Sequence, residues 1–160
     1  MKQDLAPEVE ASLDRRFADL VARQMRECPY VRGAMAFIEE QALRVPLFIA
    51  SGAPEAELRA IVEDRGLAAH FRGVFGSPRD KVTLLTTIAS DSGIALRDLV
   101  FIGDGRQDYE AARSLGMPFV GIVPPSAPVA FPEAVLVAAD LDELARRWAE
   151  VSAVLNPESR

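Results

Sequence analysis

From residue 45 onward, the sequence alternates short, continuous apolar runs with longer amphipathic stretches. The apolar runs are rich in Val, Leu, Ile and Phe, which is typical of strands that are buried on both faces of a sheet. The stretches between them repeat apolar residues every three or four positions, the spacing of a helix, and several end at a glycine. This alternation predicts an α/β fold with a mostly parallel, Rossmann-like sheet and right-handed crossovers.

The same patterns give the expected elements. Strands are expected at 45–50, 71–75, 99–102, 118–123 and 134–138. Helices are expected at 7–28, 31–43, 54–65, 77–90, 107–115 and 140–154. The Ser-Gly-Ala-Pro run from Ser51 should end the first strand, and Ser77 should cap the helix that begins there. Four prolines within 124–132 indicate a loop, and 156–160 should form a loose tail.

Composition excludes several classes of protein. The chain has 160 residues, of which 49% are apolar, so it can bury the core of one domain and is not disordered. No apolar run is long enough to span a membrane, and the N-terminus lacks the apolar region of a signal peptide. A net charge of −6 argues against nucleic-acid binding. The single cysteine suits a reducing compartment, so we expect a cytoplasmic protein.

Two carboxylates follow the most apolar strand. Asp104 comes directly after the 99–102 run within Gly-Asp-Gly, and Asp108 lies four residues further on, near the start of a helix. In parallel sheets, ligands bind beyond the carboxyl ends of the strands. Two carboxylates placed there can hold Mg²⁺ through their oxygens, although a strand-to-helix turn with an aspartate cap would have the same sequence.

Ser51, Gly52 and Lys81 are the other candidate site residues. Ser51 and Gly52 lie between a strand and a helix, where a hydroxyl and free amides can hold a phosphate, although Ser51 could equally be an ordinary helix cap. Lys81 is the only lysine besides Lys2, and it falls in the first turn of a helix, where a cation opposes the helix dipole. Neutralising a phosphoryl group would explain that placement, whereas an exposed surface lysine is the simpler alternative.

Taken together, these segments resemble motifs II, III and IV of the haloacid dehalogenase (HAD) superfamily. The matching residues are Phe48 to Gly52, Ser77 to Lys81, and Val100 to Asp108. The resemblance covers about residues 29–150, and the phosphoglycolate phosphatase and β-phosphoglucomutase branch is the most similar. It implies an HAD-like α/β core over 31–155, and a helical segment over 1–30 that corresponds to the end of a cap domain.

The resemblance also implies roles. Ser51 and Gly52 would bind the transferring phosphoryl group of a small phosphorylated metabolite, and Lys81 would neutralise its charge. Asp104 would bind Mg²⁺, with Asp108 supporting it. The reaction would be hydrolysis of a phosphate monoester through an aspartyl-phosphate. The cap governs substrate choice in this family, so the sequence does not identify the substrate.

Motif I of the family, an apolar strand followed by Asp-x-Asp-x-(Thr/Val), has no counterpart upstream of Ser51. This departure leaves three hypotheses: an incomplete phosphatase that is inactive alone, a catalytically dead binding module, or one half of a split enzyme. The first is favoured, because motifs II to IV are intact. Asp140 and Asp142 follow the 134–138 strand and could supply motif I in a permuted arrangement, but both also suit a helix start.

A missing motif I strand has a consequence for the sheet. In the family, strand 1 lies between the strands that 45–50 and 99–102 resemble, so both should present unpaired apolar edges. Such edges promote pairing with other chains, and unpaired buried amides are costly. We therefore expect the two strands to pair directly, or to receive a strand from a homodimer partner or another strand-donating chain.

Overall fold

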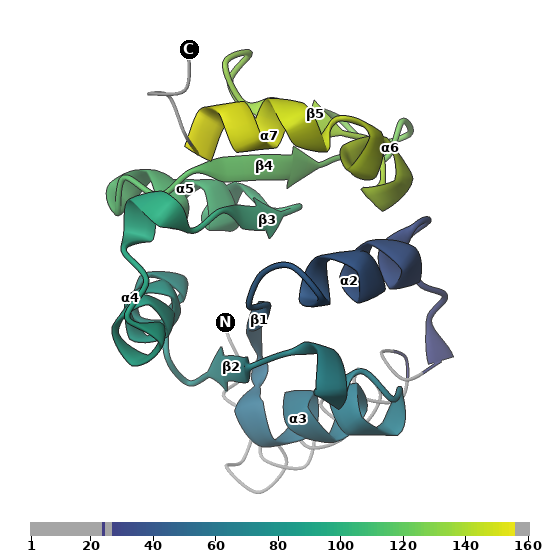
Figure 1. Ribbon diagram of the computed structural model, residues 1–160, viewed down its shortest axis with the longest axis vertical. Helices are drawn as coiled ribbons and strands as arrows, with labels where there is room; N and C mark the ends of the chain where they lie inside the picture. Colours follow the sequence, from purple (N-terminus) through teal and green to yellow (C-terminus); the bar gives the residue numbers. More distant parts are fainter. Residues whose placement is uncertain (1–23, 25–26, 156–160) are drawn as a thin grey trace, which may run out of the picture.

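The computed structural model describes residue 24 and residues 27–155 of the chain (Figure 1). Most of the helix expected over 7–28 and the tail at 156–160 lie outside these residues, so the structure does not test them. The strands are β1 (Phe48–Pro54), β2 (Gly73–Ser77), β3 (Phe101–Gly103), β4 (Phe119–Ile122) and β5 (Leu136–Ala138). The helices are α2 (Ala34–Ala42), α3 (Glu55–Asp64), α4 (Lys81–Ser92), α5 (Arg106–Ser114), α6 (Leu141–Arg146) and α7 (Trp148–Leu155).

The strands form two parallel sheets, which confirms the predicted α/β class. One sheet pairs β1 with β2, and the other has the order β3-β4-β5. Within the described part of the chain, no strand joins β1 to β3. The expected direct pairing of these two strands is therefore wrong, whereas the expectation that each has an unpaired edge is confirmed. The permuted arrangement is also wrong, because β5 pairs with β4 and does not lie between β1 and β3.

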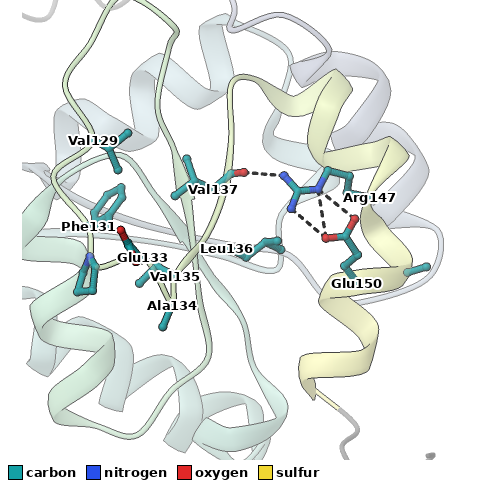
Figure 2. Close-up of a pocket in the computed structure, with 11 residues that line it drawn as sticks. Val129, Phe131, Glu133, Ala134, Val135, Leu136, Val137, Arg147 and Glu150 are labelled. Atoms are coloured by element: carbon teal, nitrogen blue, oxygen red, sulfur yellow. Dashed lines mark hydrogen bonds and ion pairs between the residues drawn. The ribbon is translucent and has the colours of Figure 1, made fainter.

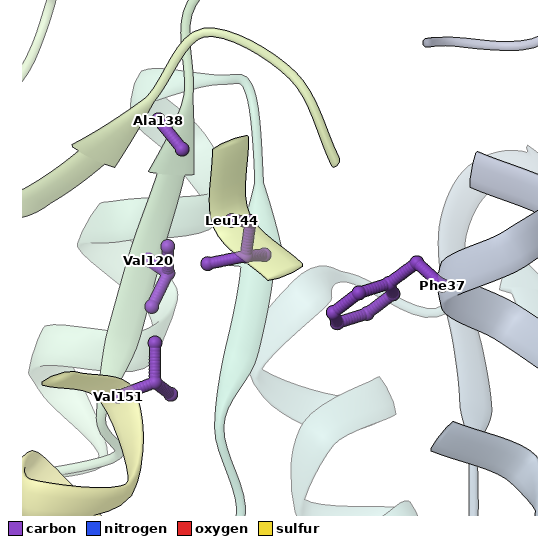
Figure 3. Close-up of a cluster of buried hydrophobic side chains, with 5 residues drawn as sticks. All are labelled: Phe37, Val120, Ala138, Leu144 and Val151. Carbon is purple, nitrogen blue, oxygen red and sulfur yellow. The ribbon is translucent and has the colours of Figure 1, made fainter. Parts of the chain in front are cut away.

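Helices α2 and α4 carry residues of the clusters that connect the two sheets. Phe37 of α2 packs its ring edge-on against Trp148, with the ring centroids 5.2 Å apart, and joins the core cluster of the β3-β4-β5 sheet (Figure 3). Met35, on the same helix, packs against the core of the β1-β2 sheet. Leu85 of α4 belongs to a third cluster, which includes Ala50 of β1 and residues of α5.

Several element boundaries differ from those expected. β1 continues through Ser51 to Pro54, because Pro54 pairs with Ser77 beyond an irregularity in the register. Ser77 therefore belongs to β2 and does not cap α4. Asp80 caps that helix instead, accepting a hydrogen bond from the Thr83 amide at 2.7 Å. The single helix expected over 140–154 is divided into α6 and α7 at Arg147, although Asp140 caps it as predicted.

None of the helices among the described residues is both long and apolar enough to cross a membrane.

Candidate functional site

Lys81 connects Ala50 of β1 to Asp108 of α5, the helix that follows β3. The Asp80 cap makes Lys81 the first residue of α4. Its ammonium nitrogen lies 2.8 Å from Asp108 Oδ1 and donates to the carbonyl oxygen of Ala50 at 3.0 Å. The two charged side chains are only 23% and 11% exposed, so this ion pair is largely shielded from solvent. The structure therefore brings together two residues that the sequence placed on separate elements.

Asp108 is fixed on both of its oxygens. While Oδ1 pairs with Lys81, Oδ2 accepts a hydrogen bond from the Gly105 amide at 3.2 Å. The carboxylate also packs closely against Gly103, where an added Cβ would lie 2.7 Å from the Asp108 Cβ. Asp108 thus holds the turn after β3 in place and orients Lys81.

Ser51 and Gly52 lie in the irregular end of β1. The Ser51 hydroxyl oxygen accepts a hydrogen bond from the Ala53 amide at 3.2 Å, which leaves the hydroxyl hydrogen able to donate. Because α3 begins at Glu55, Ser51 is not its cap, and that simpler interpretation is wrong. Gly52 is exposed, and an added Cβ there would meet nothing within 4 Å. These residues can therefore contact a phosphoryl group without disturbing the fold.

Asp104 follows β3 and is exposed. Its carboxylate can serve as one oxygen ligand of a Mg²⁺ ion, which usually retains several waters. Among the described residues, no group of three or more His, Cys, Asp or Glu side chains could hold a metal. Asp104 therefore fits a Mg²⁺ site as a partial contributor, and the remaining ligands would have to be waters, substrate oxygens or a further carboxylate.

Glu55 forms a network beside the site that the sequence analysis did not identify. Its carboxylate accepts from the Gly76 amide at 3.1 Å and from Arg59 at 2.9 Å, and forms an ion pair with Arg79. The bond from Gly76, followed by that from Arg59, lowers the pKa of Glu55 from 4.5 to about 2. The network ties the start of α3 to the segment that precedes Lys81. The pair of Glu55 with Arg59 has the four-residue spacing of a helix and could be predicted from the sequence. Arg79 is 24 residues away from Glu55, so its ion pair could not.

A cavity of about 420 Å³ lies between β1 and β3. One side is lined by α2 and Trp148, the other by Leu85 and Ile88 of α4, and the two strands form its walls. The Arg72 amide donates to the Leu47 carbonyl, and the Phe101 amide donates to the Pro118 carbonyl, so these groups point away from the cavity.

Backbone groups alternate in direction along a strand, so the cavity faces a different set of residues. The backbone groups that face the cavity belong to the residues next to Leu47, Ile49 and Phe101 in the two strands, namely Phe48, Ala50, Val100 and Ile102. Lys81 bonds to the Ala50 carbonyl and thus lies at one end of this cavity, which we call the inter-sheet groove.

A larger cavity, of about 1120 Å³, lies beside β5 and contains none of the predicted site residues (Figure 2). Here Arg147 donates to the Val137 carbonyl at 2.7 Å and pairs with Glu150 at 2.9 Å. The hydrogen bond with Glu150 raises the pKa of Arg147 above its usual value. Arg147 lies between α6 and α7 and occupies a backbone carbonyl of β5, and covering an edge strand in this way discourages pairing with other chains. The outer edge of β5 has this protection, whereas the edges of β1 and β3 face an apolar groove.

Comparison with known proteins identifies relatives. The family model described as haloacid dehalogenase-like hydrolase matches residues 1–113. A phosphoglycolate phosphatase of Escherichia coli K12 is 25% identical over 114 residues, which are 68% of this chain and 44% of that protein. The chain therefore spans less than half the length of the curated relatives that it matches.

Two solved structures show the same fold. An HAD hydrolase of family IA, variant 3, from Entamoeba histolytica has a TM-score of 0.78 at 13% identity, over 96% of this chain and 74% of that one. A predicted phosphoglycolate phosphatase from Haemophilus somnus has a TM-score of 0.75 at 17% identity, over 91% of this chain and 69% of that one.

Proposed function

The chain belongs to the haloacid dehalogenase-like hydrolase family, and we propose that it provides the phosphate-binding part of a Mg²⁺-dependent phosphatase. The substrate would be a phosphate monoester of a small metabolite, and the enzyme would be cytoplasmic. The observation that carries this proposal is the position of Lys81, which joins Ala50 of β1 to Asp108 in the first turn of α5, the helix that follows β3. A shielded cation at the carboxyl edge of parallel strands is suited to neutralise a phosphoryl group.

In this proposal each site residue has a role. Ser51 and the backbone at Gly52 bind the phosphoryl oxygens, and Lys81 neutralises charge that develops during transfer. Asp108 is a positioning residue, because its oxygens are bonded to Lys81 and Gly105. Asp104 is a ligand of Mg²⁺, which when bound would offset the negative charge of the phosphate. A carboxylate from outside the described residues forms the aspartyl-phosphate as the alcohol leaves with a proton, and water then hydrolyses this intermediate.

We propose that this carboxylate arrives on a strand that occupies the inter-sheet groove. The groove has a volume of about 420 Å³ and is lined mostly by apolar side chains, which an inserted strand would bury. A parallel strand would fill the groove and bond to the unpaired edges of β1 and β3. Its carboxyl end would then lie beside Lys81. The strand would belong to a longer form of this polypeptide, consistent with the 44% coverage of the curated phosphatase.

The test is restoration of phosphatase activity by a peptide. The peptide has five apolar residues followed by Asp-x-Asp-x-Thr, and the assay follows hydrolysis of p-nitrophenyl phosphate and of phosphoglycolate with Mg²⁺. We expect no turnover by the 160-residue chain alone, and turnover after the peptide is added. A peptide with Asn in place of the first Asp should restore nothing, because the nucleophile is missing.

Substitutions in the chain locate the activity. Lys81→Met and Asp104→Asn should abolish the restored turnover, whereas Arg97→Met, which removes a cation that is 84% exposed, should leave it unchanged. Turnover by the chain alone that persists in Asp104→Asn would contradict the assigned site. Peptide binding without any turnover would favour the catalytically dead binding module.

A further inference from the structure

Gln41 is the one strongly polar side chain that α2 buries. It is 3% exposed, near the end of the helix, and lines the inter-sheet groove together with Phe37 and Trp148. Within the described part of the chain, its amide side chain makes no hydrogen bond, although its backbone carbonyl accepts from Arg44 and Val45. No fully buried side-chain polar atom of the described residues lacks a partner, so the unbonded amide of Gln41 keeps access to the groove that it lines, where it can pair with a polar group that enters.

The geometry of a strand limits what that group can be. The backbone amides and carbonyls of a parallel strand in the groove would point sideways, toward β1 and β3. Its side chains would point alternately toward α2 and toward α4. Gln41 belongs to α2 and therefore meets a side chain of the incoming strand and not its backbone.

The surroundings of Gln41 limit the chemistry further. Phe37 and Trp148 line the cavity together with Gln41, and the one charged residue in the lining, Asp98, precedes β3 and does not belong to α2. A charged side chain on the strand would be buried without a counter-ion, which costs far more than one hydrogen bond returns. A neutral hydroxyl or amide can pair with Gln41 at little cost.

We infer that Gln41 selects the strand that completes this sheet, by hydrogen-bonding one neutral polar side chain on its α2-facing side. This inference rests on the proposed function and adds to it the chemistry by which the strand is recognised. The polar side chain lies in the first half of the strand, because the end of α2 is close in sequence to the start of β1, away from Lys81. The other positions that face α2 are apolar.

The experiment measures binding of peptides of five apolar residues followed by Asp-x-Asp-x-Thr. A Thr replaces Val at each of the five apolar positions in turn, because the two side chains have nearly the same shape. We expect one α2-facing position at which the Thr peptide binds the unaltered chain about five- to tenfold more tightly than the all-apolar peptide. In Gln41→Leu this preference should reverse, because a buried hydroxyl would then lack a partner.

Phe37→Leu is the matched control, since it alters the same side of the groove without touching an amide. It should weaken all peptides by a similar factor and leave the preference for Thr unchanged. The urea midpoints of both variants show that they are folded. If the ratio of the Thr-peptide affinity to the Val-peptide affinity were the same in Gln41→Leu and in the unaltered chain, the role of Gln41 would be overturned, while the strand proposal would remain. Failure of every peptide to bind would overturn the strand proposal as well.

Discussion

Replacing Gly103 with Ala should displace Asp108 and so disrupt its ion pair with Lys81. The added Cβ would lie 2.7 Å from the Asp108 Cβ and 2.8 Å from its Oδ2, well inside normal contact distance. Asp108 cannot yield easily, because Lys81 and the Gly105 amide hold its two oxygens. Moving it by the necessary amount would break both bonds and leave a carboxylate that is 11% exposed without its cation.

The magnitude combines two effects. Overpacking of this kind costs about 1–3 kcal/mol, and loss of hydrogen bonds to a largely buried charge adds roughly 1–3 kcal/mol. We therefore expect Gly103→Ala to lower the free energy of unfolding by about 2–6 kcal/mol, which is a urea midpoint roughly 1–3 M lower. The fluorescence of Trp148, the only tryptophan, reports the transition, because its ring packs against Phe37 in the core.

Gly52→Ala is the matched control. It adds the same methyl group at the same edge of the sheet, but nothing lies within 4 Å of the new Cβ. Its stability should stay within about 0.5 kcal/mol of the unaltered chain. If Gly103→Ala were as stable as Gly52→Ala, the close packing of Asp108 against β3 would be refuted.

Three further predictions concern the surroundings of the site. The lowered pKa of Glu55 means that its ionised form stabilises the fold above its ordinary value of 4.5 and that this contribution is lost as pH falls toward about 2. The urea midpoint of Glu55→Gln should therefore change less between about pH 6 and about pH 3 than that of the unaltered chain, and equal changes would contradict the network. Gly76→Ala should destabilise the fold by about 1–3 kcal/mol in chemical denaturation, because its Cβ would lie 2.6 Å from the Ala53 carbonyl oxygen. Calorimetry should show weak Mg²⁺ binding that Asp104→Ala removes, and tight binding that survives this change would place the metal elsewhere.

The strands could be predicted because the continuous apolar runs have few alternatives in a chain of this size. The first and last residues of each strand depend on how the strand pairs with its neighbour, and the sequence does not show this pairing. Ser77 and Asp80 both have the chemistry of a helix cap, and the choice falls on Asp80 because Ser77 pairs with Pro54 at the end of β2. The same pairing extends β1 past Ser51, where a break was expected.

The site was partly predictable. The order of strands and helices places Ser51, Lys81 and Asp108 at one edge of the sheet, and the resemblance to a known family assigns them roles. The contact of Lys81 with the Ala50 carbonyl and the ion pair of Arg79 with Glu55 join residues far apart in sequence, so only the folded chain displays them. The unpaired edges were predicted. Of the two closures that were expected, direct pairing of β1 with β3 is wrong, whereas a strand donated by a partner chain is not tested.

The central claim is that β1 and β3 are both neighbours of one strand that lies outside the described residues, and amide hydrogen exchange tests it most directly. The backbone groups of Phe48, Ala50, Val100 and Ile102 point into the inter-sheet groove, so their amides should exchange rapidly in the chain alone. Adding the peptide with Asp-x-Asp-x-Thr should slow the exchange of these alternate amides on both strands together, while those of Ile49 and Phe101, which face β2 and β4, should change little. Slower exchange on only one strand, or on neither, would contradict the account.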